Sequence, residues 1–169
     1  HPRMARIPLF LLGTALLSLD PNSARATEVF ARAGEYFDAL GFRAGGVLVE
    51  TFKAHALLAT GNHVRAEAQA KSGIEQAAKL GLLEFSWRLE ALRGKALIEL
   101  QRYDDAERAL RQAQAVVDLM AGTMASDDAK VRFGVGKEGI TLDLIRINLR
   151  KNDLAQLFED MERGRARNF

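Results

Sequence analysis

Hydrophobic positions recur at steps of three and four residues along most of this chain, which is the spacing of one face of an α-helix. The clearest example flanks the dipeptide Gln101-Arg102. The stripe before it consists of Leu89, Leu92, Ala96, Leu97 and Leu100, and the stripe after it consists of Tyr103, Ala106, Leu110, Ala113 and Val117. This segment therefore predicts two amphipathic helices joined by a short turn.

The same features return at a fixed interval. Ala26, Ala66 and Ala106 lie 40 residues apart, and Leu40-Gly41 is matched 40 residues later by Leu80-Gly81. Self-similarity with a period of 20–50 residues is typical of stacked supersecondary units. We therefore predict an all-α array of about four antiparallel helix pairs.

The periodic stripes and their breaks set the expected bounds of the helices. Residues 6–19 and 21–40 form the first pair, residues 52–59 and 63–80 the second, and Gly81 ends the latter because a residue after a helix often has positive φ. Asp127-Asp128 could begin the fourth pair, which ends with a helix over 154–167. The repeats run over about 5–41, 42–81, 82–122 and 125–167, within one domain over 1–169.

The fourth unit departs from the register of the others. If Leu154-Ala155 fills the alanine position, it comes 49 residues after Ala106. Atypical terminal repeats are common in such arrays.

The first 26 residues also resemble a secretory signal. Arg3 and Arg6 precede an apolar stretch over 7–19, and Ala24-Arg25-Ala26 resembles a cleavage site. The stretch is shorter than the roughly 20 apolar residues of a membrane span. Because Ala26 also lies in the register of the repeats, we interpret the segment as the first helix pair.

Small residues at the inter-helix crossings resemble those of tetratricopeptide repeats (TPR). They are Gly13, Ala54 and Gly94 on the first helices and Ala26, Ala66 and Ala106 on the second. Tyr103-Asp104-Asp105-Ala106 resembles the turn of that family, although its usual unit is about 34 residues. The resemblance implies a right-handed superhelix (solenoid), while the family tryptophan is missing from its usual position, Trp87 being displaced.

The C-terminal unit resembles the repeat arm that precedes the caspase-like CHAT protease domain in bacterial TPR-CHAT proteins. Arg132 and Phe133 lie early in its long first helix, and the run Glu162-Arg163-Gly164-Arg165-Ala166-Arg167 matches a run that leads into the protease. This implies a scaffold that binds or senses a partner protein for an effector domain. The alternative is the repeat arm of a signal-transduction ATPase or transcriptional activator.

Composition narrows the classes of function. The chain has 169 residues, of which 48% are hydrophobic and 27% charged, and its net charge is +2, too small to indicate a nucleic-acid partner. A basic group near the C-terminus fits solvated helix faces or an interface: Arg146, Arg150, Lys151, Arg163, Arg165 and Arg167. The absence of cysteine excludes disulfides, thiolate metal sites and a cysteine nucleophile within this chain. We expect a cytoplasmic protein with no nucleic-acid or membrane partner.

One segment contains a literal GxGxxG pattern, with glycines at Gly134, Gly136 and Gly139. A dinucleotide fingerprint requires a strand before the glycines and a helix after them, and the preceding sequence alternates poorly. Nucleotide binding is therefore a remote alternative, and a helix break or weak helix is the main prediction.

No spacing of residues predicts catalysis or metal binding. His1, His55 and His63 show no metal-ligand pattern, and the carboxylates occur as helical partners of basic residues, as Glu107 does with Arg111. We expect no enzyme activity, no cofactor and no metal.

The TPR resemblance implies that the first helices line a concave groove for a protein or peptide. Its positions carried onto this chain are Thr14, Thr51, His55, Arg88, Lys95 and Glu99. The asparagine positions of the family's clamp for acidic C-terminal peptides hold Thr14, His55 and Lys95, so that ligand is disfavoured. Leu17, Leu58 and Ile98 fall nearby, which suits a mixed apolar and polar partner; the alternative is that these residues pack or face solvent.

Overall fold

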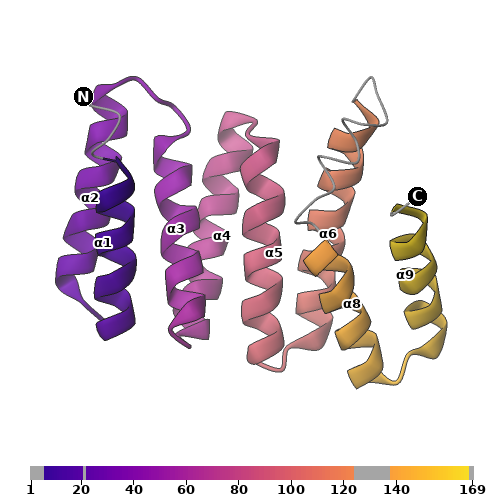
Figure 1. The fold of residues 1–169 in the computed structure, drawn as a ribbon. Helices are drawn as coiled ribbons and strands as arrows, with labels where there is room; N and C mark the ends of the chain where they lie inside the picture. Colours follow the sequence, from indigo (N-terminus) through magenta and orange to yellow (C-terminus); the bar gives the residue numbers. More distant parts are fainter. Residues whose placement is uncertain (1–5, 21, 124–137, 168–169) are drawn as a thin grey trace.

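The computed structural model describes residues 6–20, 22–123 and 138–167 (Figure 1). Within these ranges the chain forms eight α-helices and no strand, which confirms the all-α prediction. The helices are α1 (Arg6–Leu19), α2 (Ala24–Ala39), α3 (Gly45–Ala59), α4 (His63–Leu80), α5 (Leu83–Glu99), α6 (Tyr103–Gly122), α8 (Glu138–Lys151) and α9 (Leu154–Arg167).

Consecutive helices pair as antiparallel neighbours, and the pairs stand side by side along the molecule (Figure 1). The first helices α1, α3, α5 and α8 follow one another in one layer. Neighbouring first helices α1 and α3, and α3 and α5, contact each other directly, whereas the described parts of α2, α4 and α6 make no mutual contact of comparable extent. The layer of first helices is therefore the more closely spaced of the two.

The 40-residue period is visible in the backbone of the turns. Gly41 and Gly81 follow helices α2 and α4 with φ of 65° and 67°, and Gly61 ends α3 with φ of 76°. Gln101 occupies the position of Gly61 one period later and has the same left-handed conformation, with φ of 59°. Glycine adopts this conformation without strain, whereas other residues do not.

Small residues allow the two helices of a pair to approach closely. A Cβ atom at Gly94 would lie 2.6 Å from Cγ of Leu110, and one at Gly13 would lie 2.8 Å from Cζ of Phe30. The three repeat alanines Ala26, Ala66 and Ala106 are buried, with at most 1% of their surface exposed. The buried apolar side chains of the described residues form three clusters, and each cluster joins helices of neighbouring pairs.

Two helix starts differ from the predicted ones. α2 begins at Ala24 rather than Pro21, because the Ser23 hydroxyl accepts a hydrogen bond from the backbone N–H of Ala26 and caps the helix. α3 begins at Gly45, seven residues before the predicted start. Gly45 fits because its missing side chain leaves room for Phe37 of α2.

The register of the last pair also differs from the prediction. Arg102 N–H bonds to the Leu97 carbonyl in the third pair, and Asp153 N–H bonds to the Asn148 carbonyl in the fourth. Asp153 therefore matches Arg102, and Leu157 matches Ala106, 51 residues later. The expectation that Leu154-Ala155 fills this position is wrong: both residues are exposed and Leu157 is buried.

Some predictions fall outside the described residues, namely those on Asp127-Asp128, Arg132, Phe133, Gly134 and Gly136. Gly139 is described and is the second residue of α8. Over the described part of the chain, no helix combines the length and apolar character needed to cross a membrane.

Candidate functional site

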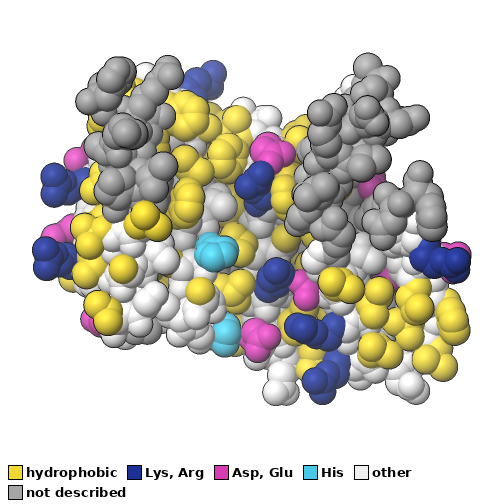
Figure 2. Space-filling model, viewed as in Figure 1, with side chains coloured by type: hydrophobic (Ala, Val, Ile, Leu, Met, Phe, Trp, Pro, Cys, Tyr) yellow, Lys and Arg dark blue, Asp and Glu magenta, His cyan; other side chains and the backbone are white. Residues whose placement is uncertain are grey.

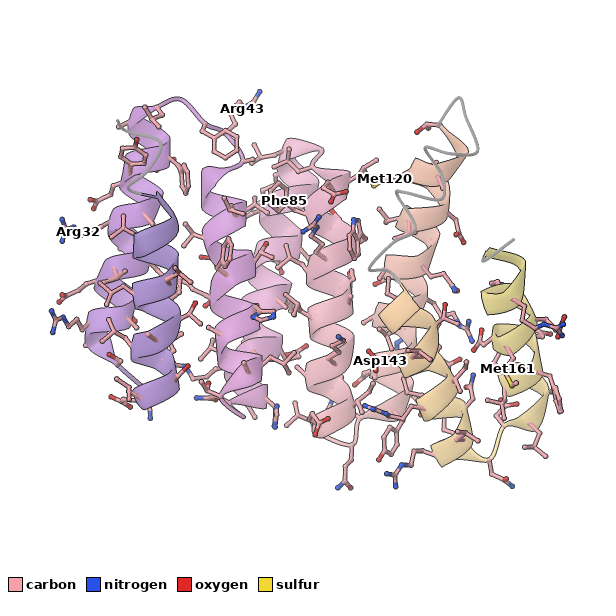
Figure 3. The ribbon with its side chains drawn as sticks, viewed as in Figure 1. Arg32, Arg43, Phe85, Met120, Asp143 and Met161 are labelled. Carbon is pink, nitrogen blue, oxygen red and sulfur yellow. The ribbon has the colours of Figure 1, made fainter. Side chains whose placement is uncertain are left out.

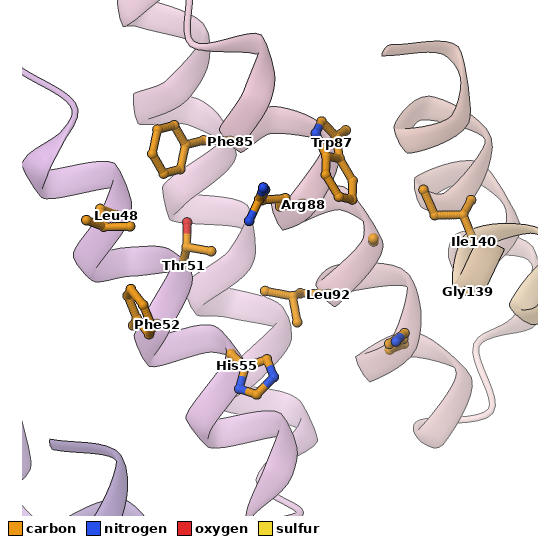
Figure 4. Close-up of a pocket in the computed structure, with 12 residues that line it drawn as sticks. Leu48, Thr51, Phe52, His55, Phe85, Trp87, Arg88, Leu92, Gly139 and Ile140 are labelled. Carbon is orange, nitrogen blue, oxygen red and sulfur yellow. The ribbon is translucent and has the colours of Figure 1, made fainter. Parts of the chain in front are cut away.

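A pocket of about 350 Å³ opens between α3, α5 and the start of α8 (Figure 4). Its described lining consists of Leu48, Thr51, Phe52, His55, Phe85, Trp87, Arg88, Ala91, Leu92, Lys95, Gly139 and Ile140. On this face of the molecule, hydrophobic side chains gather over α3, beside histidine and charged side chains toward α5 and α8 (Figure 2). We call this pocket the inner groove.

The repeat builds the inner groove from equivalent positions on two helices. α3 contributes Leu48, Thr51, Phe52 and His55, whose spacing of three, four and seven residues puts them on one helix face. α5 contributes the residues one 40-residue period later, namely Arg88, Ala91, Leu92 and Lys95. Because α3 and α5 pack side by side, the two faces merge into one surface.

Aromatic side chains form much of its apolar wall. Phe52 is 38% exposed and Phe85 is half-buried, and Figure 4 shows both among the side chains that line the pocket. Trp87 is buried and donates a hydrogen bond from Nε1 to the Glu84 carboxylate at 3.1 Å. A partner side chain placed here would be desolvated against carbon on several sides, which is favourable for apolar groups.

Arg88 is already engaged by its own helix. Its Nε donates to the Glu84 carboxylate at 3.0 Å, and its guanidinium lies 5.1 Å from the centre of the Trp87 ring. The ion pair and the cation–π contact engage Arg88 at the rim of the inner groove.

Lys95 joins the inner groove to a second pocket of about 330 Å³. That pocket is lined by Leu58, His63, Lys95, Ile98, Glu99, Asp143 and Arg146. Asp143 lies on the side of α8 that faces α5 (Figure 3). Its Oδ2 is 4.0 Å from Lys95 Nζ and its Oδ1 is 3.8 Å from Arg146 Nη1.

These two cations hold the Asp143 carboxylate only loosely. Burial raises the pKa of Asp143, and Lys95 and then Arg146 oppose that rise. Its Oδ2 has no hydrogen-bond partner within the described structure. The second pocket therefore has balanced charges: two exposed basic side chains face Asp143 and Glu99.

The structure brings most of the residues predicted for the groove close together. Thr51, His55, Arg88 and Lys95 line the inner groove, and Glu99 lines the second pocket with Lys95. Thr14 lies apart on α1 and lines neither pocket; its carbonyl accepts a hydrogen bond from Ser18 Oγ.

Sequence reasoning missed the apolar half of the inner groove. Leu48 and Phe52 lie one helical turn from the predicted Thr51 and His55, so the helical period could have identified them. Asp143 and Ile140 could not be identified in this way, because the last pair follows a different register.

The inner groove combines apolar side chains with a few polar and basic ones. Its described lining includes one hydroxyl, one imidazole and two basic side chains, but no carboxylate. No cluster of three or more histidine, cysteine or acidic side chains suited to a metal ion occurs within residues 6–20, 22–123 and 138–167. The segment before Gly134, where a dinucleotide fingerprint would require a strand, lies outside the described residues.

Comparison of the chain with protein-family models, curated proteins and solved structures found no match.

Proposed function

We propose that this chain is a protein-binding scaffold whose inner groove holds a segment of a partner protein. The observation that carries the proposal is the repetition of one helix face on α3 and α5, which creates a pocket with exposed aromatic carbon and polar side chains at its rim. Exposed apolar surface rimmed by polar residues marks interaction sites.

We further propose a TPR-like, right-handed superhelix for the array. Its support is the 40-residue recurrence of Gly94 and Ala106 at the helix crossings, the turn at Tyr103, and the close spacing of the first helices. In such an array the first helices face the concave side, where the inner groove lies.

The effector served by this scaffold is proposed from the C-terminal resemblance. The run from Glu162 to Arg167 lies in α9, with an ion pair of 3.0 Å between Arg165 and Glu162. We propose a caspase-like CHAT protease as the effector and a signal-transduction ATPase or transcriptional activator as the alternative. Coding sequence beyond Phe169 distinguishes them: a βα pattern with histidine and then cysteine favours the protease, and a helix-turn-helix the activator.

A displayed library of random peptides tests the groove function. It is panned on the natural chain, on Phe52→Ala, and on Leu119→Ala as a control that truncates an exposed apolar residue on α6, outside both pockets. We expect peptides that bind the natural chain and Leu119→Ala but not Phe52→Ala. If Phe52→Ala retains all of the recovered peptides, the inner groove is not the binding site.

A further inference from the structure

We propose that the inner groove recognises a partner segment that carries a bulky apolar side chain close to an acidic residue. The apolar side chain enters between Phe52 and Leu92, and the carboxylate binds Lys95. This inference rests on the proposed function and adds the chemistry of the partner.

The interior of the inner groove requires an apolar occupant. Phe52 and Leu92 are equivalent residues of α3 and α5, Phe85 closes one end, and Ile140 of α8 forms the opposite wall (Figure 4). A volume of about 350 Å³ lies at the lower end of ligand pockets, which suits one or two side chains rather than a large cofactor.

The charge of the rim selects for a carboxylate. No acidic side chain occurs among the described lining residues, whereas Arg88 and Lys95 are both present. Arg88 already donates to the Glu84 carboxylate at hydrogen-bond distance. Lys95 is different, because the nearest carboxylate oxygen among the described side chains, on Asp143, lies 4.0 Å away and beyond hydrogen-bond distance.

The position of Asp143 leaves Lys95 able to bind a second carboxylate. Asp143 is 8% exposed and is shared between Lys95 and Arg146. The Lys95 side chain is 48% exposed, and it belongs to the lining of both pockets. An ammonium has three donors, and none of them is within hydrogen-bond distance of Asp143.

An acidic partner residue would therefore dock on the inner-groove side of Lys95, beside His55. The second pocket cannot provide the same preference, because Glu99 and Asp143 there balance Lys95 and Arg146. The second pocket, where these charges balance, predicts no preference for the charge of the ligand. The two pockets thus make different predictions.

The sequences recovered by the peptide library give the first test. We expect phenylalanine, leucine or methionine with aspartate or glutamate within a few residues, among peptides that Phe52→Ala no longer binds. Groove-dependent peptides that are basic, or that lack acidic residues, would overturn this inference and leave the proposed function standing. Failure to recover any groove-dependent peptide would count against both.

The single tryptophan of the chain allows a quantitative second test, because Trp87 lines the inner groove and its fluorescence reports occupancy. The strongest recovered peptide is titrated beside a version with its acidic residue replaced by the amide. We expect the amide peptide to bind about threefold more weakly to the natural chain, as for a partly exposed ion pair. Lys95→Met should bind the two peptides equally.

Lys71→Met is the matched control, since Lys71 is exposed on α4 and lines neither pocket. It should preserve the difference between the acidic and the amide peptides. Equal binding of both peptides to the natural chain, or an unchanged difference in Lys95→Met, would contradict the assignment of the carboxylate to Lys95.

Discussion

At the scale of single residues, the inter-helix distance depends on positions where no side chain fits. Gly94 faces Leu110, which is completely buried and cannot move aside without disturbing its neighbours. Gly34 is also helical, in α2, but a Cβ atom there would meet nothing within 4 Å. The two glycines therefore have different physical roles although both interrupt a helical sequence.

We predict opposite effects of alanine at these two positions. Gly94→Ala should destabilise the protein, because overpacking costs about 1–3 kcal/mol and exceeds the gain in helix propensity. Gly34→Ala should stabilise it by up to about 1 kcal/mol, since alanine is the better helix former. Thermal and urea unfolding of both variants measures the difference, and a stabilised Gly94→Ala would show that the helices are not closely packed there.

At the scale of elements, the last helix pair is joined to the array by a buried polar cluster. The Arg111 guanidinium of α6 donates to both carboxylate oxygens of Asp160 in α9, with the Nη2–Oδ2 distance 2.7 Å. Asn148 of α8 donates to the same carboxylate at 2.7 Å, and Asp160 is completely buried. The hydrogen bonds to Asp160 raise the pKa of Arg111.

The predicted helical pair of Arg111 with Glu107 is confirmed, and the structure adds a second partner for Arg111. Glu107 lies 3.5 Å from Arg111, but Asp160 is the closer partner and comes from another helix pair. In the register of the last pair, Asn148 corresponds to Leu97, and Asp160 to Ala109. Polar residues thus replace core residues where the last pair joins the array.

We predict that Asp160→Ala destabilises the protein toward the lower end of about 3–5 kcal/mol, the range for a broken buried ion pair. The lower end applies because Arg111 is one-quarter exposed and can turn to Glu107 and water. Adding Asn148→Leu should restore much of the loss, because leucine occupies the equivalent position at Leu97. Urea unfolding of the single and double variants measures this difference in stability. A double variant that is no more stable than Asp160→Ala would contradict the correspondence of Asn148 with Leu97.

At the scale of the whole molecule, neighbouring helix pairs stabilise each other through the clusters of buried side chains that they share. Ala106 belongs to the cluster that joins α5, α6 and α8, whereas the cluster around Phe30 joins α1, α2 and α3 and includes Ala66 of α4 and Ala96 of α5. In a repeat array, damage at one interface affects the adjoining units first.

We predict that Ala106→Leu costs about 1–3 kcal/mol by overpacking the crossing of α5 and α6. Amide hydrogen exchange should accelerate in α5, α6 and α8, while α1 and α2 keep their protection. Ala155→Leu is the control, because Ala155 is exposed on α9. Uniform loss of protection along the whole chain in Ala106→Leu would instead indicate a single cooperative unit.

The recurring residues alone determined most of the helices. Local spacing and turn chemistry were sufficient to predict several elements. These are the helix that contains the stripe from Tyr103 to Val117, the end of a helix at Gly81, and the helix over 154–167. The start of α3 at Gly45 could not, because a Gly-Gly sequence has poor helix propensity and becomes helical by packing against Phe37.

Only the tertiary structure decided which side chains meet between units. The sequence placed Thr51, His55, Arg88 and Lys95 on helix faces of the correct period, and their proximity then followed from the packing of α3 against α5. Asp143 and Asp160 read as ordinary surface carboxylates in the sequence. Both are buried by packing between helix pairs. The last pair follows the third by 51 residues instead of 40, and this offset cannot be predicted from local patterns.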